Sequence, residues 1–177
     1  MKIGIMGAQS VGKTTLLNAL RSEEAFNDYV ICDEVTRDIR ELGLEINEDG
    51  NDVTQMLIMQ KHIVNVFLHD NMITDRTALD ALVYTTHLNN IGKVSRNTLD
   101  AIKVMYDKCI QAYDFVFYIS PEFDLVSDGV RSDDIDFRDN IVLLFEGFIS
   151  EFPREVTILT GSVRGRVEQL MKTVGVV

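Results

Sequence analysis

Short apolar runs alternate along the chain with longer segments in which apolar residues recur every three or four positions. The short runs are typical of strands buried on both faces, and the longer segments are typical of helices with one apolar side. Strands are predicted at 3–6, 29–32, 72–74, 115–119 and 156–159. Helices are predicted from the segment after the first strand to about residue 20, over 35–42, 53–69, 78–88, 95–112 and 163–174, and before the last strand.

This alternation predicts an α/β protein with three α/β/α layers around a five-stranded parallel sheet. The chain has 177 residues without internal repeats or low-complexity tracts, so we expect one domain over residues 1–177. Ligands of such sheets bind where the carboxyl ends of the strands meet. The chemistry-bearing residues are therefore sought directly after the predicted strands.

A glycine-rich segment with the pattern G-x-x-x-x-G-K-T follows the first strand. Glycines let the backbone turn its N–H groups around a phosphate, and the next helix adds its positive end. In this pattern the lysine is a mobile, exposed charge for the β- and γ-phosphates, and the next hydroxyl binds Mg²⁺. A chance match has a probability of about one in two hundred. The segment predicts a P-loop NTPase fold that binds ATP and Mg²⁺ through Gly7, Ala8, Gln9, Ser10, Val11, Gly12, Lys13, Thr14 and Thr15.

Composition narrows the class of protein. The formal charge is −11 and no basic run occurs, which disfavours tight non-specific nucleic-acid binding but leaves room for a small basic site. The two cysteines, Cys32 and Cys109, lack metal-ligand spacing and indicate a reducing compartment. No apolar run is long enough to span a bilayer, and the first one is interrupted too early for a secretory signal. We expect a cytoplasmic protein that does not enter a membrane.

Two further polar clusters follow predicted strands. Asp33 and Glu34 come after the second strand, and either carboxylate is a candidate for orienting or deprotonating an acceptor hydroxyl, with Arg37 as an anion contact. Asp75 and Arg76 come after the third strand. Here the carboxylate is a candidate Mg²⁺ ligand, and the arginine a candidate phosphate contact positioned by Asp80. Each cluster alone also fits a solvated strand end or helix start.

A polar segment at about 121–138 separates the fourth strand from the next helix. It is centred on a glycine and carries Arg131 and Arg138. Such a segment suits a mobile lid whose guanidiniums close over phosphates, although its many acids fit a solvated loop equally well.

In order and spacing, these motifs resemble the P-loop kinases typified by the ribosylnicotinamide kinase domain of the bacterial NAD regulator, which is related to deoxynucleoside and thymidylate kinases. The resemblance runs over nearly the whole chain. It rests on the phosphate loop, Asp33-Glu34-x-x-Arg37, Thr74-Asp75-Arg76 with Leu79-Asp80, Ala112-Tyr113-Asp114, Asp128-Gly129-Val130-Arg131 with Arg138, and Thr160-Gly161-Ser162. The compact chain is also similar to small kinases encoded by bacteriophages.

The resemblance implies transfer of the ATP γ-phosphoryl group to a nucleoside or nucleotide. It places Asp33 or Glu34 on the acceptor side, with Arg37 and Arg76 as anion contacts and Arg131 and Arg138 as lid cations. Gly161 and Ser162 would lie beside the adenine. On the helix at 53–69, Gln60 is a candidate for lining the acceptor pocket, although a solvent-facing glutamine is the simpler interpretation.

Three alternatives stay open. One is a kinase acting on a hydroxymethylated base within DNA, which the acidic charge disfavours. Another is a regulatory ATPase or NTP-binding switch without a small-molecule acceptor; the Asn-Lys-x-Asp segment of GTPases is missing. A degenerate binding module is disfavoured because Lys13, Thr14, Asp75 and Arg131 are all present. The helices on either side of the third strand are a candidate homodimer face.

Overall fold

The computed structural model describes residues 1–122 and 135–176. Within these residues five strands form one parallel sheet in the order β2-β3-β1-β4-β5. The strands are β1 (Lys2–Met6), β2 (Val30–Cys32), β3 (Met72–Asp75), β4 (Phe115–Ile119) and β5 (Thr157–Leu159). The predicted α/β class and the five-stranded parallel sheet are confirmed.

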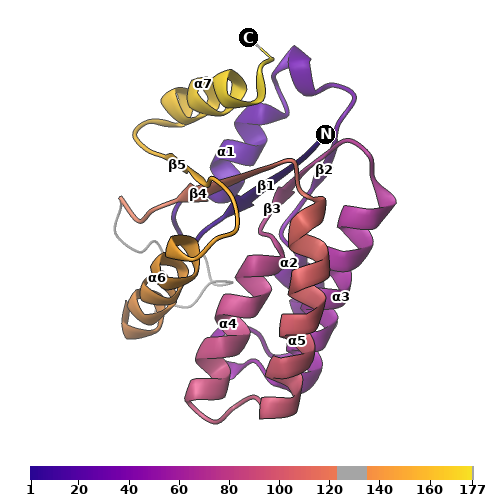
Figure 1. The fold of residues 1–177 in the computed structure, drawn as a ribbon, viewed down its shortest axis with the longest axis vertical. Coiled ribbons are helices and arrows are strands. Elements are labelled where there is room, and N and C mark those ends of the chain that lie inside the picture. Colours follow the sequence, from indigo (N-terminus) through magenta and orange to yellow (C-terminus); the bar gives the residue numbers. More distant parts are fainter. Residues whose placement is uncertain (123–134, 177) are drawn as a thin grey trace.

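Helices cover both faces of the sheet (Figure 1). The face with α1 (Lys13–Leu20) and α7 (Val163–Val174) is the smaller layer, and these two helices pack on each other. The other helices form the larger layer, in which α4 contacts α5 and α6. They are α2 (Val35–Glu41), α3 (Asp52–Leu68), α4 (Ala78–Asn90), α5 (Arg96–Cys109) and α6 (Ile135–Ser150). Short 3-10 turns lie at Glu24–Phe26, Asn47–Asp49 and Ile110–Ala112.

The central strands carry the core. Ile3, Ile5 and Met6 of β1 and Ile73 of β3 are fully buried, as expected for parallel strands covered on both faces. The register pairs Ile5 with Asp75, so the end of β3 lies beside the start of the phosphate loop. This pairing brings the two strand-end clusters to the edge that carries the loop.

The largest difference from the predicted elements concerns the segment before the last strand. The predicted lid extended to residue 138, but α6 begins at Ile135 and carries Arg138 in its first turn. Phe137, Ile141 and Phe145 are buried at four-residue intervals, so an apolar helical stripe overrides the acidic composition that suggested a loop. Of the helices in the described ranges, none is long and apolar enough to cross a bilayer.

Candidate functional site

The phosphate loop connects β1 to α1 and depends on two glycines. Gly7 and Gly12 have φ angles of 147° and 93°, in a region that side chains disfavour. A Cβ atom on Gly7 would also lie 2.6 Å from the carbonyl oxygen of Ile119 in β4. Residues with a side chain would therefore be strained at both positions. The loop lies between a strand and a helix, which is the arrangement that phosphate binding requires.

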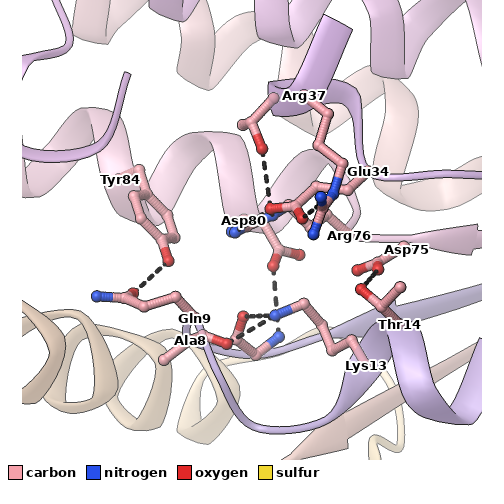
Figure 2. Close-up of polar contacts among 12 residues, drawn as sticks. Ala8, Gln9, Lys13, Thr14, Glu34, Arg37, Asp75, Arg76, Asp80 and Tyr84 are labelled. Carbon is pink, nitrogen blue, oxygen red and sulfur yellow. Dashed lines mark hydrogen bonds and ion pairs between the residues drawn. The ribbon is translucent and has the colours of Figure 1, made fainter. Parts of the chain in front are cut away.

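Lys13 folds back onto this loop. Its Nζ donates hydrogen bonds to the carbonyl oxygens of Gly7 at 2.7 Å and Ala8 at 2.6 Å, and the side chain is buried (Figure 2). The expectation of an exposed lysine is wrong here, because the loop's own carbonyls hold the ammonium group. Burial, and then the positive charge of Arg76, lower the pKa of Lys13 to about 8.

Glu34 and Arg76 form a buried ion pair beside the loop. Nη2 of Arg76 lies 2.5 Å from Oε1 of Glu34, and Nε donates to the same oxygen at 2.8 Å. Thr36 also donates to that oxygen at 2.8 Å. Burial by itself would raise the pKa of Glu34, but the charges of Arg76 and Lys13 hold it well below its usual range. Glu34 is therefore an ionised carboxylate in a water-poor site.

Arg76 takes a backbone conformation with φ 77°, which is unusual for a residue other than glycine. Its N–H donates to the carbonyl of Ile5, and its carbonyl accepts from the hydroxyl of Thr74. Its guanidinium carbon lies 5.1 Å from the ring centroid of Tyr84. Strained backbone held by several contacts is typical of functional sites, and here it directs the arginine toward Glu34.

The structure separates the two acceptor-side candidates. Asp33 is exposed and its carboxylate pairs with Arg21 at 2.6 Å, away from the loop. Glu34 instead lies in the centre of the site, where Nε of Arg37 is 3.4 Å from its second oxygen. Of the two carboxylates, only that of Glu34 is brought together with Lys13 and Arg76, because successive residues of an extended segment point in opposite directions.

Asp75 and Thr14 meet at the metal position that the sequence predicts. The Thr14 hydroxyl donates to Oδ2 of Asp75 at 2.6 Å (Figure 2). Oδ1 of Asp75 is buried and has no hydrogen-bond partner among residues 1–122 and 135–176. Burial raises the pKa of this carboxyl group. One hydroxyl and one carboxylate with a spare oxygen fit Mg²⁺, which takes few protein ligands and fills its shell with phosphate oxygens and water.

Asp80 joins the loop to helix α4. One of its oxygens accepts from the backbone N–H of Gly7 at 3.3 Å, and the other accepts from the backbone and hydroxyl of Thr77. The latter contacts form a capping box that begins α4. The prediction placed Asp80 near Arg76 as a positioning residue, and the structure shows that its hydrogen bonds go to the loop and the helix start.

A small pocket of about 20 Å³ lies next to these groups, between α2, α3 and α4. Arg76 and Asp80 lie between this pocket and the phosphate loop, so the two sites adjoin. The remaining lining is mostly neutral: Thr36, Asn47, Gln55, Ile58, His62, Ala81 and Tyr84.

Gln60 does not line this pocket. Its side chain is exposed on α3, where it lines two larger surface grooves with Leu57, of about 490 and 320 Å³. The glutamine that lines the pocket is Gln55, which is buried and accepts a hydrogen bond of 3.0 Å from the hydroxyl of Thr85. Five residues on a helix correspond to a rotation of about 140°, which explains why the two glutamines face different surroundings.

Several residues of the site carry no motif and were not predicted. Tyr84 donates to the side chain of Gln9 at 2.7 Å, and His62 is fully enclosed in the pocket. On the other side of the loop, buried Arg166 donates to the carbonyl of Val11 at 3.0 Å and pairs with Glu122 at 3.1 Å. The sequence offers one signal for these residues: each is a polar residue that falls on the inward side of a predicted helix.

The remaining candidates lie at the rim or outside the described part. Gly161 has φ 81° and donates its N–H to Glu122 at 2.9 Å, and Ser162 caps α7. Thr15 is exposed on α1. Arg138 is buried in the first turn of α6. Arg131 and the 128–131 segment of the predicted lid lie outside the described residues, so their role stays a prediction.

Comparisons with known proteins agree with the fold. Solved structures of the same fold include deoxyadenosine kinase from M. mycoides with products dCMP and dCDP bound (TM-score 0.73, 16% identity, 100% of both chains covered). They also include NadR protein in complex with NAD and AMP-PNP (TM-score 0.73, 16% identity), which covers 99% of this chain but only 50% of that one. YorR protein from Bacillus subtilis, in complex with phosphorylated GDP, has a TM-score of 0.61 at 20% identity, with 98% and 95% covered.

No protein of curated function matches the chain significantly. At these identities the structural likeness concerns the fold. A family model described as an AAA domain matches residues 2–166, which is most of the chain and includes the phosphate loop, Glu34, Asp75 and Arg76. The chain therefore belongs to this family of AAA domains, with a P-loop as its nucleotide-binding element.

Proposed function

We propose that the protein is an ATP-dependent phosphotransferase that moves the γ-phosphoryl group of Mg-ATP to a nucleoside or nucleotide acceptor. The observation that carries this proposal is the ionised carboxylate of Glu34, which Arg76 holds in a buried ion pair beside the phosphate loop. A kinase needs a general base for the acceptor hydroxyl as well as a phosphate-binding loop. The kinases of the same fold support the proposal.

In the proposed reaction the acceptor hydroxyl oxygen bonds to the γ-phosphorus of ATP as the bond to the β–γ bridging oxygen breaks, which gives ADP. Glu34 takes the proton of that hydroxyl, for which an ionised carboxylate is required. Lys13 leaves the carbonyls of Gly7 and Ala8 to bind the β- and γ-phosphates. Arg76 holds Glu34 in place and adds positive charge beside the transferred group.

Thr14 and Asp75 are the residues proposed to hold Mg²⁺, directly or through water. The ion supplies charge neutralisation at the β- and γ-phosphates. Gln9 and the loop N–H groups complete the phosphate cradle, and Gly161 and Ser162 are proposed to lie beside the adenine.

The test is ADP formation from Mg-ATP with and without acceptors: nucleosides, nucleoside monophosphates, ribosylnicotinamide, and DNA containing hydroxymethylated bases. Turnover that requires one acceptor, with phosphate recovered on it, supports the kinase. Phosphorylation of the DNA alone would instead favour the base-modifying kinase, and turnover indifferent to every acceptor would favour the regulatory ATPase. Lys13→Ala should abolish transfer while circular dichroism shows a folded protein; unchanged turnover in that variant would contradict the assigned site.

A homodimer through the larger helical layer is also proposed. Helix α3 exposes large apolar side chains toward solvent: Val53, Val64, Phe67 and Leu68 are between 50% and 69% exposed. Sedimentation of the full chain over a range of concentrations tests this, and a monomer at every concentration would contradict it.

A further inference from the structure

Arg166 is a buried arginine that contacts the phosphate loop from the side of α7. It lies in the first turn of α7 and is 2% exposed. Nη1 donates a hydrogen bond of 3.0 Å to the carbonyl oxygen of Val11, and a Cβ atom on Gly12 would lie 3.2 Å from the same nitrogen. The guanidinium therefore packs directly against the end of the loop, where α1 begins.

This contact sets the direction of one peptide group of the loop. The peptide between Val11 and Gly12 is trans, so its C=O and N–H groups point in opposite directions. Because Arg166 holds the carbonyl of Val11, the N–H of Gly12 points away from the arginine. Gly12 is the N-cap of α1, and N–H groups at the start of the helix after such a loop are those that bind phosphate. Arg166 thus fixes the direction of one donor of the phosphate cradle.

Glu122 connects this arginine to a second loop. Its Oε2 pairs with Nη2 of Arg166 at 3.1 Å and accepts from the backbone N–H of Gly161 at 2.9 Å. Glu122 follows β4, and Gly161 lies between β5 and α7. One carboxylate therefore links the arginine that holds the phosphate loop to the turn that is proposed to lie beside the adenine.

Packing alone does not account for a buried ion pair at this place. Removing a guanidinium from water costs free energy that pairing returns only in part, and apolar residues of similar volume often stabilise a fold equally well or better. Val167 and Leu170 on the same helix are buried and apolar, so an apolar side chain would also suit position 166. The retained pair indicates a role in directing the loop.

We infer that Arg166 and Glu122 form a positioning pair, which holds the Val11–Gly12 peptide in the orientation that binds the phosphates of a nucleotide and joins it to the turn at Gly161. The inference rests on the phosphate-binding part of the proposed function and not on transfer to an acceptor. Binding is measured without turnover, so the two can fail separately.

The first test compares Arg166→Met with Arg164→Met. Methionine keeps much of the length of the side chain but has no donor. Arg164 lies two residues earlier on α7, is 91% exposed and pairs with Glu168 at 3.0 Å, which makes it the matched control. Calorimetric titration gives the Kd of Mg-ATP, Mg-ADP and inorganic tripolyphosphate. We expect Arg166→Met to raise all three about tenfold or more, because the Gly12 donor is no longer pre-organised, and Arg164→Met to leave them within twofold of the wild type.

Glu122→Gln tests whether the two side chains act as a unit. Glutamine keeps the length of the side chain but loses its charge, so Arg166 is held less firmly and the Kd of tripolyphosphate should also rise. The double variant should bind no more weakly than Arg166→Met alone, because both substitutions disturb one contact. Additive losses would mean that the side chains act independently, and would overturn the pair.

A purely structural pair would not change the response of the loop to phosphate. Nitrogen-15 spectra of glycine-labelled protein follow the Gly12 amide, with Gly175 at the far end of α7 as the reference. Tripolyphosphate should shift the Gly12 resonance in the wild type and in Arg164→Met, and shift it less in Arg166→Met. A lower melting temperature with the Kd and the Gly12 shift unchanged would mean that the pair only stabilises the fold, and the inference would be wrong.

If Arg166→Met does not fold, Arg166→Lys is the second variant. Lysine keeps the positive charge but lacks the planar fork that reaches Val11 and Glu122 at once, so its Kd values should lie between those of the wild type and tenfold weaker binding. A lysine variant with the Kd of tripolyphosphate within twofold of the wild type would contradict the inference.

The outcomes also separate the two proposals. If the wild type transfers phosphate but Arg166→Met binds tripolyphosphate as the wild type does, the inference is wrong and the kinase stands. If tripolyphosphate binding depends on Arg166 but no acceptor is phosphorylated, the inference stands and the proposed function fails. If the wild type binds neither ATP nor tripolyphosphate, the inference is overturned.

Discussion

The hydroxyl of Tyr84 donates a hydrogen bond of 2.7 Å to the side-chain carbonyl of Gln9, which joins the wall of the pocket to the phosphate loop (Figure 2). The ring of Tyr84 also lies against the guanidinium of Arg76, with 5.1 Å between the guanidinium carbon and the ring centroid. One side chain thus contacts the loop, the buried ion pair and the pocket. Whatever occupies the pocket is in direct contact with a residue that holds the loop.

Tyr84→Phe is the variant that tests this connection. It keeps the ring against Arg76 but removes the hydroxyl, which hydrogen-bonds Gln9 and also contacts Arg76. The free energy of unfolding should therefore fall by about 1 kcal/mol and the Kd of ATP should rise several-fold. Urea denaturation and calorimetric titration measure the two effects. Tyr106→Phe on α5 is the matched control, and equal changes in both variants would mean that the contact with Gln9 has no special role.

Glu34→Gln should lower kcat by about 10²- to 10⁴-fold, because the amide cannot take the proton of the acceptor hydroxyl. The amide oxygen can still accept from Arg76, so ATP binding should persist. Asp33→Asn is the neighbouring control, with little effect expected because Asp33 pairs with exposed Arg21. Steady-state kinetics with the identified acceptor measure both variants; a larger loss in Asp33→Asn would reassign the base.

The ionisation of Lys13 predicts a pH dependence of stability. Because burial lowers its pKa from 10.5 to about 8 in the folded chain, the folded state releases the proton before the unfolded state does. The cost of the buried charge is complete below pH 8 and is relieved as pH rises from about 8 to 10.5, by on the order of 3 kcal/mol at about 1.4 kcal/mol per pKa unit. Wild-type protein should therefore gain stability relative to Lys13→Met over this range.

Urea denaturation of both proteins at pH 7 and pH 10 measures the difference. A stability gap between wild type and Lys13→Met that is constant across the range would contradict the lowered pKa. Groups that titrate identically in both proteins cancel in this comparison.

Thr14 is the residue for testing the Mg²⁺ position. Thr14→Val removes the hydroxyl that contacts Asp75, so the Mg²⁺ concentration needed for half-maximal ATP binding should rise about tenfold or more. Thr14→Ser keeps the hydroxyl and should restore the wild-type requirement. If the valine variant responds to Mg²⁺ as the wild type does, Thr14 is not part of the metal site.

The succession of strands and helices along the chain and the phosphate loop could be predicted because each depends on local sequence. Apolar runs and the spacing of Gly7, Gly12 and Lys13 are visible without tertiary contacts. The choice between Asp33 and Glu34 could not be predicted, because adjacent residues point in opposite directions and only the packed chain shows which direction faces the loop.

Residues that come together only through tertiary packing could not be predicted from the sequence either. Gln55 and His62 belong to the pocket because α3 presents one side to α4, and no local pattern distinguishes Gln55 from Gln60. The burial of Lys13 could not be predicted for a related reason. It depends on two carbonyl groups whose direction is set by the loop's unusual backbone angles.

The order of the strands in the sheet determines which parts of the site can change in sequence independently of the others. The phosphate loop follows β1, which is hydrogen-bonded on both sides, by β3 and β4. Glu34 follows β2, a three-residue strand at the sheet edge with β3 as its neighbour. Mutations that shift β2 or the helices behind it can reshape the pocket while the loop keeps both of its supports. Mutations there can therefore change which of the proposed acceptors the protein prefers while disturbing nucleotide binding least.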